Sequence, residues 1–133
     1  MSWSDDYIGI PEKAHGRDRR GLDCWGLVWL VHANELGIDL PCHSDDYRST
    51  NALGELDALL SSDVRRHDWI EVPGPGWFTV PLFRTGRYAS HVGVTVDAQH
   101  FLHVTGGSVR LTLYSDPVWR CRLLGHYRHV EAP

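Results

Sequence analysis

Cys24 is the side chain in this sequence that is best placed for chemistry. It stands where a polar, glycine-containing loop, Arg20–Asp23, changes abruptly into an apolar run that begins at Trp25. A thiol in the first turn of a helix lies among unpaired backbone N–H groups and at the positive end of the helix dipole, and both favour the thiolate. Asp23 occupies the position of a helix N-cap. A lone cysteine at a helix start is more often a small buried residue, so a catalytic role needs partners elsewhere in the chain.

Two histidines on neighbouring predicted strands are the candidate partners. In the run His91–Val96 three valines share one face, so His91 is expected to point the other way, towards the helix that carries Cys24. A short turn leads into the next strand and brings His103 alongside His91. An ordinary thiol is mostly protonated at neutral pH, so it needs an imidazole that takes its proton and a third group that holds the imidazole. The three residues match the roles of nucleophile, base and orienting group.

The elements that must position these residues begin with the cysteine helix. Its apolar run predicts a helix whose first half is buried, which turns polar at His32 and stops at Gly37. A second, amphipathic helix is predicted to follow a cap at Thr50. Its apolar face consists of four leucines, Leu53, Leu56, Leu59 and Leu60. Residues 3–22 predict a short helical turn and a solvated loop that builds no core.

From residue 69 the pattern changes to strands separated by tight turns. The predicted strands are Trp69–Val72, Gly76–Phe83, His91–Val96, Phe101–Val104, Val109–Leu113 and Cys121–Val130. The small Gly93 is expected to let the cysteine helix or a substrate approach closely. Helices first and strands afterwards indicate an α+β domain with a mainly antiparallel sheet. The 133 residues suit one such domain, 1–133, and are too few for two of ordinary size.

Composition argues against several function classes. The 42% hydrophobic and 23% charged residues are typical of a globular protein, and a net charge of −4 argues against nucleic acid as a partner. No window approaches the length of a membrane span, so membrane insertion is not expected. The segment Met1–Tyr7 carries acidic residues and no apolar stretch, which predicts synthesis in the cytoplasm without a signal peptide.

No metal and no other cofactor is expected. The three cysteines, Cys24, Cys42 and Cys121, are an odd number without a C-x-x-C pair, which argues against a disulfide framework and a cysteine-based zinc site. His100 and His103 are three residues apart on a predicted strand and therefore point to opposite faces, which is a poor arrangement for binding one metal ion.

Two features leave alternatives open. The cluster of Arg17, Arg19 and Arg20 could lower the pKa of the Cys24 thiol or attract acidic peptides, but charge runs are more often solvated loops, which is the preferred interpretation. Trp77 could stack on a substrate or pack into the core.

Taken together, several segments closely resemble the NlpC-type cell-wall cysteine peptidases. The cysteine motif is Gly21–Val28, with Tyr7–Pro11 and a Gly16–Asp18 loop before it and Glu35–Pro41 after it. Ser90–Val94 resembles the family's base-bearing strand, and Leu102–Val104 resembles its third catalytic position. Trp25, directly after the cysteine, resembles the phage tail-assembly branch of the family. The resemblance covers nearly the whole chain in the right order.

The resemblance implies a compact papain-like α+β fold and hydrolysis of amide bonds in peptidoglycan stem peptides, without metal. It implies Cys24 as the nucleophile, His91 as the general base and His103 as the residue that orients the base. Three further residues match positions that line the substrate site in relatives: Tyr7, Asp23 and Ser90.

The tail-assembly branch implies a phage or phage-derived tail that acts in the periplasm or cell wall, with other tail proteins as partners. A catalytically silent tail component that keeps the peptidase fold is the alternative. Transfer of an acyl group to an acceptor other than water would use the same residues and stays open.

Overall fold

The computed structural model describes residues 2–48, 54, 58 and 68–133. The helical segments are η1 (Trp3–Asp6), α1 (Cys24–Val31), the π-helix η2 (His32–Leu36) and α3 (Pro117–Arg122). The strands are β1 (Arg17–Asp18), β2 (Gly21–Leu22), β3 (Trp69–Val72), β4 (Val80–Thr85), β5 (Tyr88–Val92), β6 (Val94–Thr95), β7 (His100–Thr105), β8 (Ser108–Leu113) and β9 (Leu123–His129). The predicted α+β class is confirmed. The helix predicted over Leu53, Leu56, Leu59 and Leu60 lies outside the described residues.

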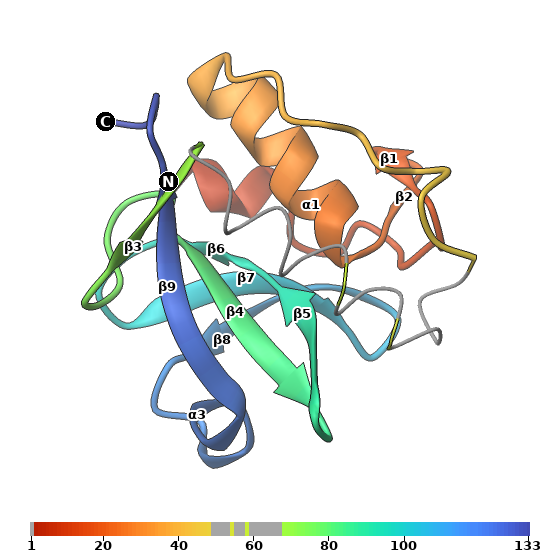
Figure 1. Cartoon of the computed structure of the whole chain (residues 1–133). Coiled ribbons are helices and arrows are strands. Elements are labelled where there is room, and N and C mark those ends of the chain that lie inside the picture. The colour runs from red at the N-terminus through yellow and green to blue at the C-terminus, as the bar shows by residue number, and fades with distance from the viewer. Residues whose placement is uncertain (1, 49–53, 55–57, 59–67) are drawn as a thin grey trace.

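Two antiparallel sheets form the body of the fold. Their strand orders are β3-β9-β4-β5 and β6-β7-β8, and every pairing within them is antiparallel, as predicted. Helix α1 lies over one side of these strands and α3 lies by the opposite side (Figure 1). The apolar core joins residues of α1, such as Leu27 and Val28, to residues of β5, β6 and β7, such as Val92 and Leu102. Within the described ranges, no helix combines the length and apolar character that a membrane crossing needs.

Helix α1 begins and ends where the sequence predicts. The carboxylate of Asp23 accepts the backbone N–H of Gly26 at 2.8 Å, which is the bond expected of an N-cap. The chain leaves the helical region through η2, and Gly37 takes the left-handed conformation, φ 66°, that ends many helices. Cys24 is therefore fixed at the first helical residue.

Gly93 divides the predicted strand His91–Val96 between the two sheets. Strand β5 ends at Val92 and β6 begins at Val94. A Cβ atom on Gly93 would lie 2.4 Å from the carbonyl oxygen of Leu102, so only glycine lets β7 pass this close to the crossing. The close approach predicted at Gly93 is real, but the approaching element is β7 rather than the cysteine helix.

The N-terminal segment corrects a second expectation, because it does contribute to the core. Tyr7 and Leu22 are fully buried, and Ile10 is nearly so. Backbone hydrogen bonds join Gly9 and Ile10 to Val109, which attaches the segment to β8. The apolar residues of this segment are separated by glycines and charged residues and follow no regular period, so the sequence pattern does not predict their burial.

Two predicted strands begin later than expected. Residues 76–79 form a turn in which the Thr79 hydroxyl bonds both backbone groups of Gly76, so β4 starts only at Val80. Trp77 in this turn is 69% exposed, which excludes the core interpretation. Near the C-terminus, Asp116 caps α3 with Pro117 in its first turn, and β9 follows from Leu123.

Candidate active site

The thiol of Cys24 lies against the backbone of β5, the last strand in its sheet. Cys24 is 9% exposed, and its S–H donates to the carbonyl oxygen of Ser90 over 4.0 Å. Burial, and then the negative charge of Asp23, raise the pKa of Cys24 to about 12, although the backbone N–H groups of Val92 and Trp25 favour the thiolate. The sequence predicts a thiolate at the helix start. In the structure burial outweighs the helix terminus, and the resting group is a neutral thiol.

His91 and His103 form a directly bonded pair, as the strand pattern predicts. The Nε2 atom of His91 lies 3.0 Å from the Nδ1 atom of His103. The Nε2 atom of His103 lies 2.9 Å from the hydroxyl oxygen of Thr112 on β8. Among the described residues, the Nδ1 atom of His91 has no hydrogen-bond partner. The pair therefore leaves one imidazole nitrogen available for a proton.

The rings of Phe83 and Trp119 pack against the histidine pair and form an aromatic wall beside it. The ring of Trp119 on α3 lies 5.0 Å from that of His91 at 31° and meets the ring of His103 edge-on at 4.5 Å. Burial lowers the pKa of His91 to about 4, with a further contribution from Arg122. Burial also lowers the pKa of His103 to about 3, helped by the charges of His91 and Arg110. Both imidazoles are neutral near pH 7, which is the form that a general base needs.

The expected direction of the His91 side chain is wrong. Val92 and Val94 belong to the same core as α1, whereas the ring of His91 lies among Phe83, His103 and Trp119. The valines take the face towards the helix because α1 is itself apolar on nearly every side and needs an apolar surface to cover it. Cys24 meets the strand of His91 at its edge.

In the part of the chain that the structure describes, no hydrogen bond joins the Cys24 thiol to an imidazole. Among the described residues, the Sγ atom of Cys24 has one recorded hydrogen-bond acceptor, Ser90, which directly precedes His91. The chain thus places all three predicted catalytic residues in one region, with His91 and His103 bonded and Cys24 turned to the backbone beside them.

Asp23 is buried beside Cys24 and fully occupied by donors. Its carboxylate accepts the Arg17 guanidinium at 2.7 Å, the backbone N–H groups of His15 and Gly26, and the Tyr47 hydroxyl. The preferred interpretation of Arg17 as part of a solvated loop is therefore wrong, because this side chain is 11% exposed in an ion pair. These contacts give Asp23 a role in holding the helix start.

Ser90 and Tyr7 differ in their distance from the thiol. Ser90 touches Cys24 through its carbonyl oxygen, while its own hydroxyl donates to the Tyr88 carbonyl at 3.3 Å. Tyr7 is fully buried and donates at 2.7 Å to Glu35, which lies in η2 at the opposite end of the helix from Cys24. Burial, and then Glu35, raise the pKa of Tyr7 to about 12. The structure thus places Tyr7 in the core and away from the cysteine.

Sequence reasoning missed Thr112 and Trp119. For Thr112 a signal exists, because a turn at Gly106–Gly107 pairs Phe101 with Thr112 and makes Thr112 a diagonal neighbour of His103. Trp119 lies in a stretch whose helical start was signalled by Asp116 followed by Pro117. The contact of Trp119 with the histidines is non-local and had no local signal.

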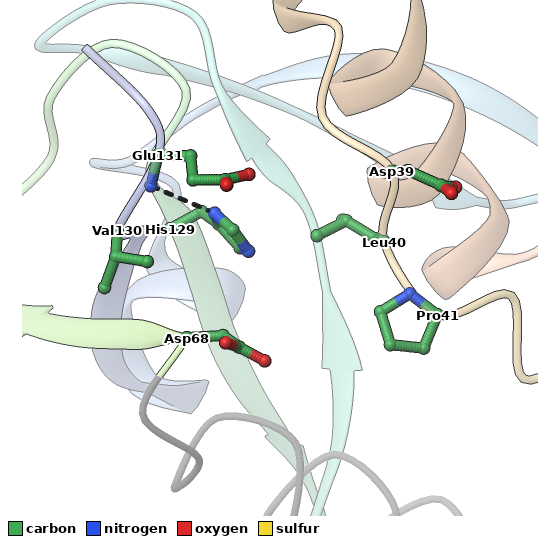
Figure 2. Close-up of a pocket in the computed structure, with 7 residues that line it drawn as sticks. All are labelled: Asp39, Leu40, Pro41, Asp68, His129, Val130 and Glu131. Carbon is green, nitrogen blue, oxygen red and sulfur yellow. Dashed lines mark hydrogen bonds between the residues drawn. The ribbon is translucent and has the colours of Figure 1, made fainter.

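A separate pocket of about 400 Å³ lies between the start of β3, the end of β9 and the segment after η2 (Figure 2). Its lining residues are Asp39, Leu40, Pro41, Asp68, His129, Val130 and Glu131. None of the three predicted catalytic residues lines it. No group of three or more potential metal ligands is arranged around a common point in the described ranges, this pocket included.

Comparisons with known proteins find relatives over most of the chain. The model of the NlpC/P60 family matches residues 12–128. The chain is 28% identical over 119 residues to the murein DD-endopeptidase MepS/murein LD-carboxypeptidase of Escherichia coli (strain K12), covering 88% of this chain and 54% of that protein. It is 29% identical over 118 residues to a probable endopeptidase of Haemophilus influenzae, covering 86% of this chain and 63% of that protein. The chain thus spans little more than half the length of these curated relatives.

Two solved structures have the same fold. The NlpC/p60 domain of the peptidoglycan hydrolase SagA matches with a TM-score of 0.62 and 18% identity, covering 94% of this chain and 92% of that one. A lipoprotein-like NLP/P60 protein of Staphylococcus aureus matches with a TM-score of 0.65 and 20% identity, covering 94% of this chain and 38% of that one.

Proposed function

Because the chain belongs to the NlpC/P60 family, we propose that it is a cysteine peptidase that hydrolyses amide bonds of peptidoglycan stem peptides. Cys24 is the proposed nucleophile, His91 the general base and His103 the residue that orients the base. The observation that carries this proposal is the 3.0 Å contact of His91 Nε2 with His103 Nδ1, together with the bond of the Cys24 thiol to Ser90, the residue directly before His91. The relatives named as murein and peptidoglycan hydrolases support the substrate class.

The proposed reaction starts from two neutral groups. The thiol leaves Ser90, and its proton passes to His91 Nδ1 as the sulfur attacks the scissile carbonyl carbon. The carbonyl electron pair moves to the oxygen, which the backbone N–H of Cys24 and a neighbouring donor stabilise. His91 then gives the proton to the leaving amine. Water, deprotonated by His91, hydrolyses the thioester and returns the thiol.

Incubation with purified sacculi or muropeptides tests the proposal. Wild-type protein is expected to release new amino groups with time, and Cys24→Ala to release none above background. Cys121→Ala is the matched control, because Cys121 is an exposed cysteine outside the proposed catalytic set. Equal turnover by wild type and Cys24→Ala would exclude Cys24 as the nucleophile.

One observation favours a second candidate, a catalytically silent component that keeps the peptidase fold. The Cys24 thiol is nearly buried, has a raised pKa and already has a hydrogen-bond acceptor at Ser90. Iodoacetamide discriminates the two. An enzyme must open this site, so Cys24 is expected to be alkylated near neutral pH and protected by a muropeptide, whereas a silent component leaves Cys24 unmodified while Cys42 and Cys121 react.

The proposal extends to a phage or phage-derived tail as the place of action, in the periplasm or cell wall, with other tail proteins as partners. It rests on Trp25 directly after Cys24. In the fold the Trp25 indole donates to the Pro41 carbonyl at 2.8 Å and so ties the loop after η2 to the helix start. Peptide mass spectrometry of purified tail particles tests this part, and its failure leaves the peptidase proposal standing.

A further inference from the structure

We propose that Thr112 is a positioning residue that fixes the proton arrangement of the histidine pair, so that His91 presents an unprotonated Nδ1 atom to Cys24. The inference rests on the proposed function and extends it by one residue. Its basis is a continuous chain of two contacts, from His91 Nε2 to His103 Nδ1 at 3.0 Å and from His103 Nε2 to Thr112 Oγ1 at 2.9 Å.

The strand register puts Thr112 where this contact requires it. In the β7–β8 pair, His103 faces Arg110 and Phe101 faces Thr112, so Thr112 is the diagonal neighbour of His103 on the same sheet face. His103 is fully buried and has no access to bulk water. Among the described residues, the Thr112 hydroxyl is the recorded partner of His103 Nε2. A buried imidazole N–H without this oxygen would have no acceptor.

The direction of the hydrogen bonds follows from the work that His91 must do. To take the Cys24 proton at Nδ1, His91 must carry its own hydrogen on Nε2 and donate it to His103 Nδ1. His103 then carries its hydrogen on Nε2 and donates it to the Thr112 hydroxyl oxygen. The opposite direction places a hydrogen on His91 Nδ1 and blocks the base. A threonine hydroxyl can donate or accept, and in the proposed arrangement Thr112 supports the working tautomer by accepting from His103 Nε2, in the way that outer partners orient metal-bound imidazoles.

The positive charges around the pair disfavour an extra proton on either imidazole, and the charge of Arg110 opposes transfer of the proton from His91 to His103. Arg110 on β8 and Arg122 on α3 are the positive charges that act on His103 and His91, respectively, and Cys24 is the titratable group at the strand edge. When His91 becomes an imidazolium, His103 still accepts through Nδ1 and Thr112 still accepts through Oγ1. No proton passes beyond His91, so Thr112 has no direct part in the chemistry.

Thr112→Val and Thr112→Ser test this assignment, because valine keeps the shape without the oxygen and serine keeps the oxygen. Two measurements are made on each: muropeptide turnover against pH, and nitrogen-15 NMR of the imidazoles in the resting protein. We expect Thr112→Val to lower kcat roughly 10-fold at unchanged KM and to remove the Nε2-protonated signature of His103. Thr112→Ser is expected to restore both.

Thr85→Val is the matched control, since Thr85 ends strand β4 and its hydroxyl has no hydrogen bond among the described residues. If Thr112→Val fails to fold, Thr112→Ala replaces it. An Nε2-protonated His103 that survives the loss of the hydroxyl overturns the proposal, as does a serine variant that behaves like valine. The NMR result is independent of turnover, so an inactive wild type would contradict the proposed peptidase while the tautomer assignment is still decided.

Discussion

Two buried polar clusters lie close to the start of α1, and they are built on opposite plans. In the Asp23 cluster, made of Asp23, Arg17 and Tyr47 with the backbone of residues 15 and 26, the carboxylate receives four donors. In the histidine pair, His91 and His103, every nitrogen but one has a partner. The carboxylate oxygens of Asp23 are all occupied by donors, whereas the Nδ1 atom of His91 has no hydrogen-bond partner among the described residues. The Asp23 cluster therefore stabilises the fold, and the histidine pair has a nitrogen that can accept a proton.

Charge separates the two clusters as clearly as bonding does. The Asp23 cluster contains a buried ion pair, which tolerates burial because each charge faces the other. The histidine pair has no acidic partner among the described residues, and burial lowers the pKa of His91 to about 4 and of His103 to about 3. Neutral imidazoles suit a base, while a permanent carboxylate beside Cys24 raises the pKa of the thiol. Asp23 therefore disfavours the thiolate of Cys24 and fixes the start of α1.

The largest expected effect is on catalysis by His91. His91→Ala is expected to lower muropeptide turnover about 1000-fold, because general-base catalysis contributes that order of rate. Folding stability should fall only modestly, through the lost ring contacts with Phe83 and Trp119. Amine release and urea denaturation measure the two quantities. His100→Ala is the control, because His100 is a partly exposed histidine that bonds Asp97 in a neighbouring turn. If stability fell in parallel with turnover, the histidine pair would also stabilise the fold, and the distinction between the two clusters would be wrong.

Removal of the carboxylate should break the fold-holding cluster instead. Asp23→Ala leaves the Arg17 guanidinium largely buried and without its counter-charge, so we expect a loss of about 3 kcal/mol in the free energy of unfolding. Urea denaturation at pH 7 measures it. Asp18→Ala is the matched control, because its partner Arg20 is highly exposed and the pair should contribute nothing measurable. Equal losses from both variants would contradict the distinction between a buried and an exposed pair.

Local signals in the sequence account for the elements that carry both clusters. Asp23 before an apolar run predicts the cap, and Gly37 predicts the stop. The turn after the strand of His91 predicts the adjacency to His103, because hairpin pairing and strand alternation are local rules. The same rules predict the strand register that makes Thr112 a neighbour of His103. They do not say which face of a strand the helix covers, so His91 was expected towards α1 and lies towards α3.

Non-local contacts explain what the sequence could not show. Arg17 resembles its exposed neighbours in a charge run, and only the folded chain brings Tyr47 and Asp23 to it. Tyr7 matches a family position by its place before the motif, yet its hydroxyl meets Glu35 at the far end of the helix. In both cases the deciding partner lies outside the sequence window that the pattern uses.

Acid should weaken the fold through the buried histidines. The pKa of His32, like that of His91, is lowered by burial to about 4 from 6.5. The unfolded chain then binds protons that the folded chain does not, so stability is complete above pH 6.5 and falls as the pH drops towards 4. We expect a loss of about 1 kcal/mol per pH unit for each such histidine. Urea midpoints between pH 7 and 4.5 measure it.

His32→Leu separates the contributions, because the Nε2 atom of His32 is buried without a partner and the residue plays no part in the proposed reaction. In this variant the free energy of unfolding should fall less steeply with decreasing pH, by the contribution of one histidine. Turnover at pH 7 should stay unchanged. An unchanged slope would mean that His32 does not titrate in the folded chain over this range.

The smallest effect is expected at the aromatic wall that keeps the histidine pair neutral. Trp119→Ala admits water beside His91, so the pKa of His91 should rise from about 4 towards its ordinary value of 6.5. More of the base is then protonated at pH 5, and turnover there should fall several-fold, while turnover at pH 8 changes little. Val118→Ala, an exposed neighbour on the same helix, is the control. An acid limb that stays in place in Trp119→Ala would show that the wall does not set the protonation of His91, and the neutrality of the pair would then have to come from Arg110 and Arg122.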